Sequence, residues 1–167
     1  MLLNYIHRLG WFVGLVLLQV LILNNVHIGG YATPFLYIYL ILKFSSNTSR
    51  NELMLWAFAV GLAVDVFSDT PGMNAASSVL LAFVRPAILP LFSLRDMVEG
   101  IEPGFRSMGT GGFFKYVAAC VLVHHTALLS LEYFSFVHLG TLSLHIVSSV
   151  ALTAVCLMAI EGICRRQ

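Results

Sequence analysis

The chain has 167 residues, of which 59% are hydrophobic and only 10% are charged, and its formal net charge is +1. An ordinary soluble domain carries about 25% charged residues, so the composition argues against a soluble protein and favours an integral membrane protein. The balanced charge, with no clustered basic face, also excludes a nucleic-acid partner. The three cysteines lie in apolar stretches, and their spacing is typical neither of a metal site nor of a disulfide framework.

Six apolar stretches fill nearly the whole sequence, and each is close to the length that a helix needs to cross a hydrocarbon layer of about 30 Å. They predict a single all-α integral membrane domain, residues 1–167, built as a bundle of six transmembrane helices. Pro34 lies in the first helical turn of the second stretch, where proline is tolerated. Pro86 and Pro90 lie inside the fourth stretch and should kink its helix. The predicted spans are residues 9–25, 29–44, 53–69, 75–92, 113–132 and 139–163.

The basic residues indicate the orientation of this bundle. Apart from Arg85, they occur at the amino end, at the second and fourth connections and at the carboxyl end: Arg8, Lys43, Arg50, Arg95, Arg106, Lys115, Arg165 and Arg166. The first, third and fifth connections contain no lysine or arginine. Under the positive-inside rule, this pattern predicts that both termini are cytoplasmic.

The fourth connection, residues 93–112, is longer and more polar than the others. Leu94, Met97, Val98 and Ile101 fall at helical spacing, with charged residues on the other faces. The pattern predicts a short amphipathic helix in the cytoplasmic interface, with a solvated loop as the alternative. The stretch "EPGFRSMGTGGFFK" that follows is expected to be a flexible return to the membrane.

Asp65 is the most unusual residue, because it lies twelve residues into an apolar stretch that starts at Leu53. At 1.5 Å per residue it is about 18 Å along the helix, in the outer half of the bilayer. Ala57, Gly61, Asp65 and Asp69 recur every four residues and therefore share one face, which we expect to be buried against other helices. The two acids then face a pocket or a partner; alternatively, Asp65 is a structural acid whose hydrogen bonds are met locally.

Three further features bear on the interpretation of this acid. Glu132, at the outer end of the fifth span, either lines the same pocket or is solvated at the interface. Arg85 is about 10 Å from the cytoplasmic end of the fourth span and is expected to snorkel to the interface, with a salt bridge to Asp65 as the alternative. Pro71 and Gly72 predict a tight outer turn between the third and fourth spans.

No metal, cofactor or catalytic site is expected. His124, His125 and His145 lie at different depths, so interhelical hydrogen bonds are the expected role of these histidines. The sequence contains no HExxH motif, no GxSxG motif and no Ser/His/Asp set at compatible depths.

The stretch "GLAVDVFSDTPGMNAASSVLLAF", residues 61–83, resembles the signature of the MreD family of rod shape-determining membrane proteins. The proline-led "TPFLYIYLIL" in the second span and "LEYF" at the end of the fifth are also similar to that family, whereas the polar stretch 93–112 is longer than its usual connection. The matching signature positions are Gly61, Asp65, Ser68, Gly72 and Ala75 or Ala76.

The resemblance implies a non-enzymatic scaffold in the bacterial inner membrane. Such proteins bind MreC and work with the MreB filament, a RodA-type glycosyltransferase and a penicillin-binding transpeptidase in lateral peptidoglycan synthesis and cell shape. The leading hypothesis is therefore an outer-leaflet pocket, set in membrane lipid, that receives a segment of MreC. The candidate contact residues are Asp65, Asp69, Gly61, Arg85 and Glu132.

The alternative function is the substrate-binding membrane subunit of an energy-coupling-factor vitamin transporter, which is also a six-helix membrane protein of similar size. Such subunits dock on a partner through stripes of small residues, and Ala59 and Ala63 would serve here.

Overall fold

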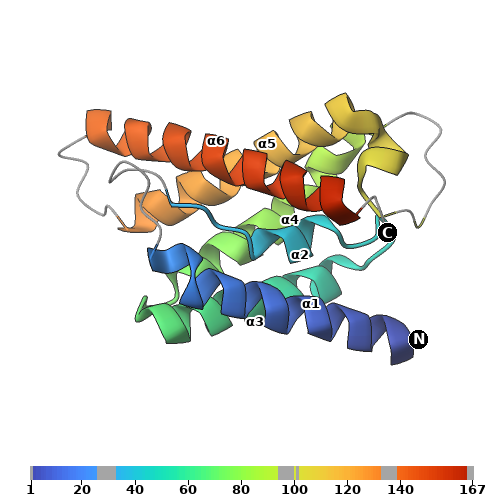
Figure 1. Cartoon of the computed structure of the whole chain (residues 1–167), viewed down its shortest axis with the longest axis horizontal. Coiled ribbons are helices and arrows are strands. Elements are labelled where there is room, and N and C mark those ends of the chain that lie inside the picture. Colours follow the sequence, from blue (N-terminus) through green and yellow to red (C-terminus); the bar gives the residue numbers. More distant parts are fainter. Residues whose placement is uncertain (1, 26–32, 94–99, 101, 133–138, 165–167) are drawn as a thin grey trace.

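The computed structural model of the chain describes residues 2–25, 33–93, 100, 102–132 and 139–164. These residues form α-helices and one 3-10 helix and contain no strand, which confirms the predicted all-α class (Figure 1). The elements are α1 (Leu2–Leu21), η1 (Leu23–Asn25), α2 (Ile38–Leu42), α3 (Arg50–Ser68), α4 (Met73–Phe92), α5 (Phe105–Glu132) and α6 (Leu139–Cys164).

Four of the described helices are long and apolar enough to cross a membrane: α3, α4, α5 and the part of α6 from Ser143 to Cys164. The apolar part of α1, Arg8–Leu21, is shorter than these. By length and composition, the described helices are therefore those of a membrane protein.

The helices α3, α4, α5 and α6 pack against one another in chain order, and α1 packs on α3. The start of α1 and the end of α6 lie at the same end of the bundle, together with the α2–α3 connection and the start of α5 (Figure 1). We call this the near end, and we call the opposite end, which carries the α3–α4 turn, the far end. Lys43 and Arg50, at the two ends of the α2–α3 connection, and Arg106 at the start of α5 therefore lie at the near end.

The predicted second span, residues 29–44, differs from the structure, because its described part is not one long helix. Residues 33–36 are not helical, and α2 has only five residues. Pro34 explains the difference: it has no N–H to donate, and it favours an extended conformation at Thr33. The helix consequently begins after the proline rather than around it.

The non-helical segment 33–36 is held between α1 and α6. Gln19 of α1 is fully buried; its side chain accepts a hydrogen bond from the Leu36 N–H at 2.8 Å and donates one to the Pro34 carbonyl at 3.0 Å. Irregular backbone at membrane depth is tolerated only where protein satisfies its polar groups. Two hydroxyls of α6 complete the pairing: Ser149 accepts from the Thr33 N–H at 3.2 Å and Thr153 from the Phe35 N–H at 3.1 Å.

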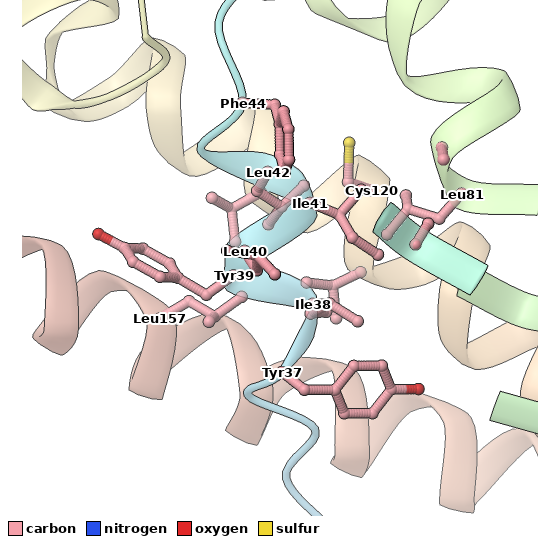
Figure 2. Close-up of a cluster of buried hydrophobic side chains, with 14 of the residues drawn as sticks. Tyr37, Ile38, Tyr39, Leu40, Ile41, Leu42, Phe44, Leu81, Cys120 and Leu157 are labelled. Carbon is pink, nitrogen blue, oxygen red and sulfur yellow. The ribbon is translucent and has the colours of Figure 1, made fainter. Parts of the chain in front are cut away.

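Helix α2 lies in the centre of the hydrophobic core, and all five of its residues are buried. In Figure 2, Leu81 and Cys120 lie on one side of α2, and Leu157 lies on the other. Tyr37 and Tyr39 point to opposite sides of the segment, so their hydroxyls reach different parts of the bundle (Figure 2).

Helix α5 begins at Phe105 rather than at residue 113, so the segment predicted to be a flexible return is helical from Phe105 onward, except for a kink at Gly109. Gly109 is non-helical within it (φ 70°, ψ 163°), a conformation that glycine adopts without a side-chain clash. The predicted amphipathic helix over residues 94–101 lies outside the described residues, apart from Gly100.

Candidate functional site

The α3–α4 hairpin is held together by Gly61. This residue is buried, and a Cβ atom built on it would lie 2.6 Å from both the Ala75 Cα and the Asn74 carbonyl oxygen. The backbones of the two helices therefore touch at a position where only hydrogen fits. Ala57, one turn earlier on the same face, is fully buried, as the stripe of small residues predicts.

Asp65 lies on this buried face and is only 3% exposed. Its Oδ2 accepts a hydrogen bond from the Ala75 N–H at 2.8 Å, and its Oδ1 accepts from the Asn74 N–H at 3.0 Å and from Asn74 Nδ2 at 2.9 Å. The Thr70 hydroxyl donates to the same Oδ1 at 2.6 Å. The first N–H groups of a helix have no partner within it and favour a carboxylate, so Asp65 caps α4. This is the structural role that the sequence left open.

Asp69 does not lie on the buried face that carries Asp65. The helix ends at Ser68, and Asp69 follows it as an exposed residue with left-handed backbone (φ 53°). The four-residue repeat places two side chains on one face only while the helix continues, so the predicted pair of acids is separated. Gly72 supplies a second left-handed residue (φ 78°) and Pro71 is exposed, which gives the tight turn that the sequence predicts.

A chain of buried hydrogen bonds connects Asp65 to α5. The Tyr37 hydroxyl donates to Asn74 Oδ1 at 2.9 Å and lies 2.8 Å from His124 Nε2. The single Tyr37 proton is used by Asn74, so His124 donates from Nε2. Tyr37 and His124 are fully buried, and Asn74 is 4% exposed. The acid in α3 is thereby linked through α4 and the segment before α2 to the middle of α5.

Of the other two histidines considered above, His125 bonds to a neighbouring helix. His125 Nε2 lies 3.1 Å from the Thr153 hydroxyl, which is the kind of interhelical bond predicted for it, and its Nδ1 lies 2.9 Å from the Val121 carbonyl. His145 lies apart from both and lines a cavity at the far end of the bundle. Across the described ranges, no group of three or more His, Cys, Asp or Glu side chains could hold a metal ion.

A cavity of about 410 Å³ lies at the far end of the bundle, beside the α3–α4 turn. Asp65 does not line this far-end cavity and reaches it only through its partners Thr70 and Asn74; Asp69 takes no part in it. Glu132, at the end of α5, is exposed and also lines this cavity, so it combines the two alternatives that the sequence left open. The polar side chains of its wall include Asn24, Ser68, Thr70, Asn74, Glu132 and His145.

Arg85 performs neither of its predicted roles. It is 2% exposed, so it does not reach the interface. Its Nε donates to the Tyr116 hydroxyl at 2.8 Å, and its Nη2 donates to the carbonyls of Leu42, at 3.2 Å, and Phe44. It therefore binds the end of α2, where carbonyl groups lack helical partners. At 1.5 Å per residue it lies about 16 Å along α4 from the first turn that Asp65 caps, too far for an ion pair.

Several polar residues that hold the fold are absent from the sequence-based predictions, Tyr37 and Asn74 among them. Two of these residues, Gln19, described above, and Glu161, lie inside apolar stretches. Glu161 is 7% exposed near the end of α6; it lies 3.2 Å from Lys43 Nζ and accepts a hydrogen bond from the Tyr39 hydroxyl at 2.7 Å. Lys43 also donates to the Pro103 carbonyl at 2.9 Å. The available signal for each was a single polar residue inside an apolar stretch, "LLQVL" and "AIEGI".

No family model, no curated protein and no solved structure matches the chain.

Proposed function

We propose that this chain is a non-enzymatic scaffold of the bacterial cell-elongation complex, of the MreD type, in the inner membrane with both termini in the cytoplasm. In this role the far end faces outward and binds a segment of an MreC-like protein. Through that partner the chain acts with the MreB filament, a RodA-type glycosyltransferase and a penicillin-binding transpeptidase in lateral peptidoglycan synthesis.

The observation that carries the proposal is that the residues resembling the MreD signature meet in one hairpin. Gly61 lets α4 approach, Asp65 bonds to the Ala75 N–H, and Gly72 forms the turn. Ser68 accepts a hydrogen bond from Asn24 Nδ2 at 2.5 Å, which ties the same hairpin to the segment after α1. Ala75, rather than the exposed Ala76, is the alanine that makes the contact. A shared signature of this kind is expected to preserve a shared surface.

The test is co-isolation. The full-length chain would be produced with a tagged MreC-like protein from the same organism, solubilised in mild detergent and recovered through the tag. We expect the two proteins to co-purify in a fixed ratio, and we expect cells depleted of the chain to lose their rod shape. Normal shape after depletion, together with no recovery of the chain, would refute the proposal.

The cavity supports a second candidate function, the substrate-binding subunit of an energy-coupling-factor vitamin transporter. Its volume of about 410 Å³ falls within the range of roughly 300–1,000 Å³ for small-molecule pockets. Ala59 is exposed on α3 and Ala63 is half-buried, so this small-residue stripe is open to a partner. Mass spectrometry of extracts from the purified protein would reveal a bound vitamin. Co-purification of ATPase subunits instead of MreC would favour this candidate.

A further inference from the structure

We infer that the far-end cavity binds a positively charged hydrogen-bond donor, namely the ammonium or guanidinium group of a lysine or arginine side chain of the partner protein. The inference rests on the proposed function, for which it names the chemical group that enters the site.

The first argument is the hydrogen-bond inventory of Thr70 and Asn74, which both line the cavity. The Thr70 hydroxyl proton is donated to Asp65, and the two Nδ2 hydrogens of Asn74 are donated to Asp65 and, at 3.1 Å, to Thr70. A hydroxyl has one proton and two lone pairs, and an amide oxygen has two lone pairs. Thr70 Oγ1 accepts one bond from Asn74, and Asn74 Oδ1 accepts one from Tyr37. Each oxygen keeps one lone pair, so these groups can only accept a hydrogen bond from a ligand.

The second argument is charge. The hydrogen bonds described for Asp65 all come from neutral donors, so none of them neutralises its negative charge, which lies directly behind Thr70 and Asn74 of the cavity wall. Glu132 adds a second carboxylate at the cavity wall. The three connections at this end contain no lysine or arginine. The local potential therefore favours a cation and disfavours an anion.

The third argument is shape, which favours a long side chain over a bare ion. Val64, Leu128 and Leu129 line the cavity together with the polar groups, and Glu132 is exposed at the end of α5. Lysine and arginine bury their methylene stems along apolar surface while the charged head seeks acceptors. With about 30 Å³ per water molecule, a volume of 410 Å³ accommodates one such side chain with several waters.

The experiment compares Glu132→Gln, which removes the charge and keeps the size, with Asp69→Asn, which removes the same charge from an exposed position outside the cavity. Affinity for the full-length MreC-like partner would be measured by biolayer interferometry, with the full-length chain in nanodiscs. We expect Glu132→Gln to weaken binding about tenfold, because it removes a charge-assisted hydrogen bond, and Asp69→Asn to leave it unchanged. We also expect n-hexylammonium chloride, but not n-hexanol, to compete with the partner.

The outcomes separate this inference from the proposed function. If the partner binds and both variants bind it equally well, the cation inference is overturned while the scaffold proposal stands. If the wild-type chain does not bind the partner, the scaffold proposal fails. Thermal unfolding in the presence of n-hexylammonium chloride or n-hexanol then shows which kind of ligand the cavity binds. If n-hexylammonium raises the midpoint of thermal unfolding of the wild-type chain but not of Glu132→Gln, the cavity binds a free amine and not a side chain of the partner. If n-hexanol stabilises the chain as much as n-hexylammonium does, the inference that the cavity binds a cation is overturned.

Discussion

Asp65 shows how a single carboxylate can be accommodated within an apolar helix. It accepts hydrogen bonds from two backbone N–H groups at the start of α4 and from the side chains of Asn74 and Thr70. In an Asp65→Asn variant, one of the two oxygens becomes an NH₂ group that faces existing donors. We expect the free energy of unfolding to fall by about 1–3 kcal/mol, measured by denaturant titration in detergent.

The matched control at this scale is Asp69→Asn, which makes the same change at an exposed residue four positions later. Its effect should remain within about 0.5 kcal/mol. If the two variants were equally stable, the capping role of Asp65 would have to be abandoned.

Gly61 makes a second prediction at the scale of the residue. In Gly61→Ala, the added Cβ would lie 2.6 Å from backbone atoms of α4, which cannot move aside as a flexible side chain could. The hairpin must open, and overpacking of this kind costs about 1–3 kcal/mol. The loss should appear as a lower midpoint of thermal unfolding in detergent.

Gly14→Ala provides the comparison for this change, because a Cβ at Gly14 of α1 would meet nothing within 4 Å. Replacing an unconstrained helical glycine with alanine stabilises a helix by about 0.5–1 kcal/mol. We therefore expect the two substitutions to have opposite signs. A loss of stability in Gly14→Ala as large as that in Gly61→Ala would contradict the close-contact explanation.

The segment before α2 is the element that depends most on side chains from other elements. Replacing Gln19 with leucine keeps similar bulk but leaves the Leu36 N–H and the Pro34 carbonyl without their partner. We expect faster amide hydrogen exchange across residues 35–42, measured by mass spectrometry, and about 1–3 kcal/mol lower stability. Leu17→Ala, at an exposed site of the same helix, should leave the exchange of this segment unchanged.

The positions of α3, α4 and α6 could be predicted from apolar run length, because each run is bounded by polar or turn residues. The non-helical segment 33–36 could not be predicted in this way, because its backbone N–H groups are hydrogen-bonded to Gln19 and to hydroxyls more than a hundred positions away in α6. A run of apolar letters does not reveal such distant pairing. The same reason explains why Arg85 was misplaced: two of its acceptors are the carbonyl groups of Leu42, the last residue of α2, and of Phe44, just beyond it, and backbone acceptors have no sequence signature.

The arrangement of the whole molecule yields a prediction about topology. Cys164 is exposed at the near end, and Asp69 is exposed at the far end. In intact cells, a membrane-impermeant maleimide should label an Asp69→Cys variant at residue 69 and leave Cys164 unlabelled, if the near end is cytoplasmic. Permeabilisation should expose Cys164, and mass spectrometry would identify the labelled site. Labelling of Cys164 before permeabilisation would reverse the proposed orientation.

At this scale the sequence also predicted where polar groups collect, but only in part. The stripe of small residues correctly placed Gly61 and Asp65 on a buried face. The predicted pocket was to be lined by Asp65 and Asp69, but of the three acids only Glu132, for which solvation was the alternative, lines the cavity. The helix stop at Ser68, which turns Asp69 away, depends on a left-handed residue that the four-residue repeat does not reveal. The contacts of Glu161 depend on Tyr39 and Lys43, which only the folded chain brings to it.

The hydrogen bonds of segment 33–36 also bear on the order in which the protein is made. A ribosome synthesises this segment long before Ser149 and Thr153, which later accept its N–H groups. The α3–α4 hairpin, by contrast, closes between residues about ten positions apart and can form as soon as it emerges. The two backbone donors of the nascent chain must therefore be hydrogen-bonded to water or to the insertion machinery until α6 is inserted. The insertion of α6 is then the step that completes the hydrogen bonds of segment 33–36.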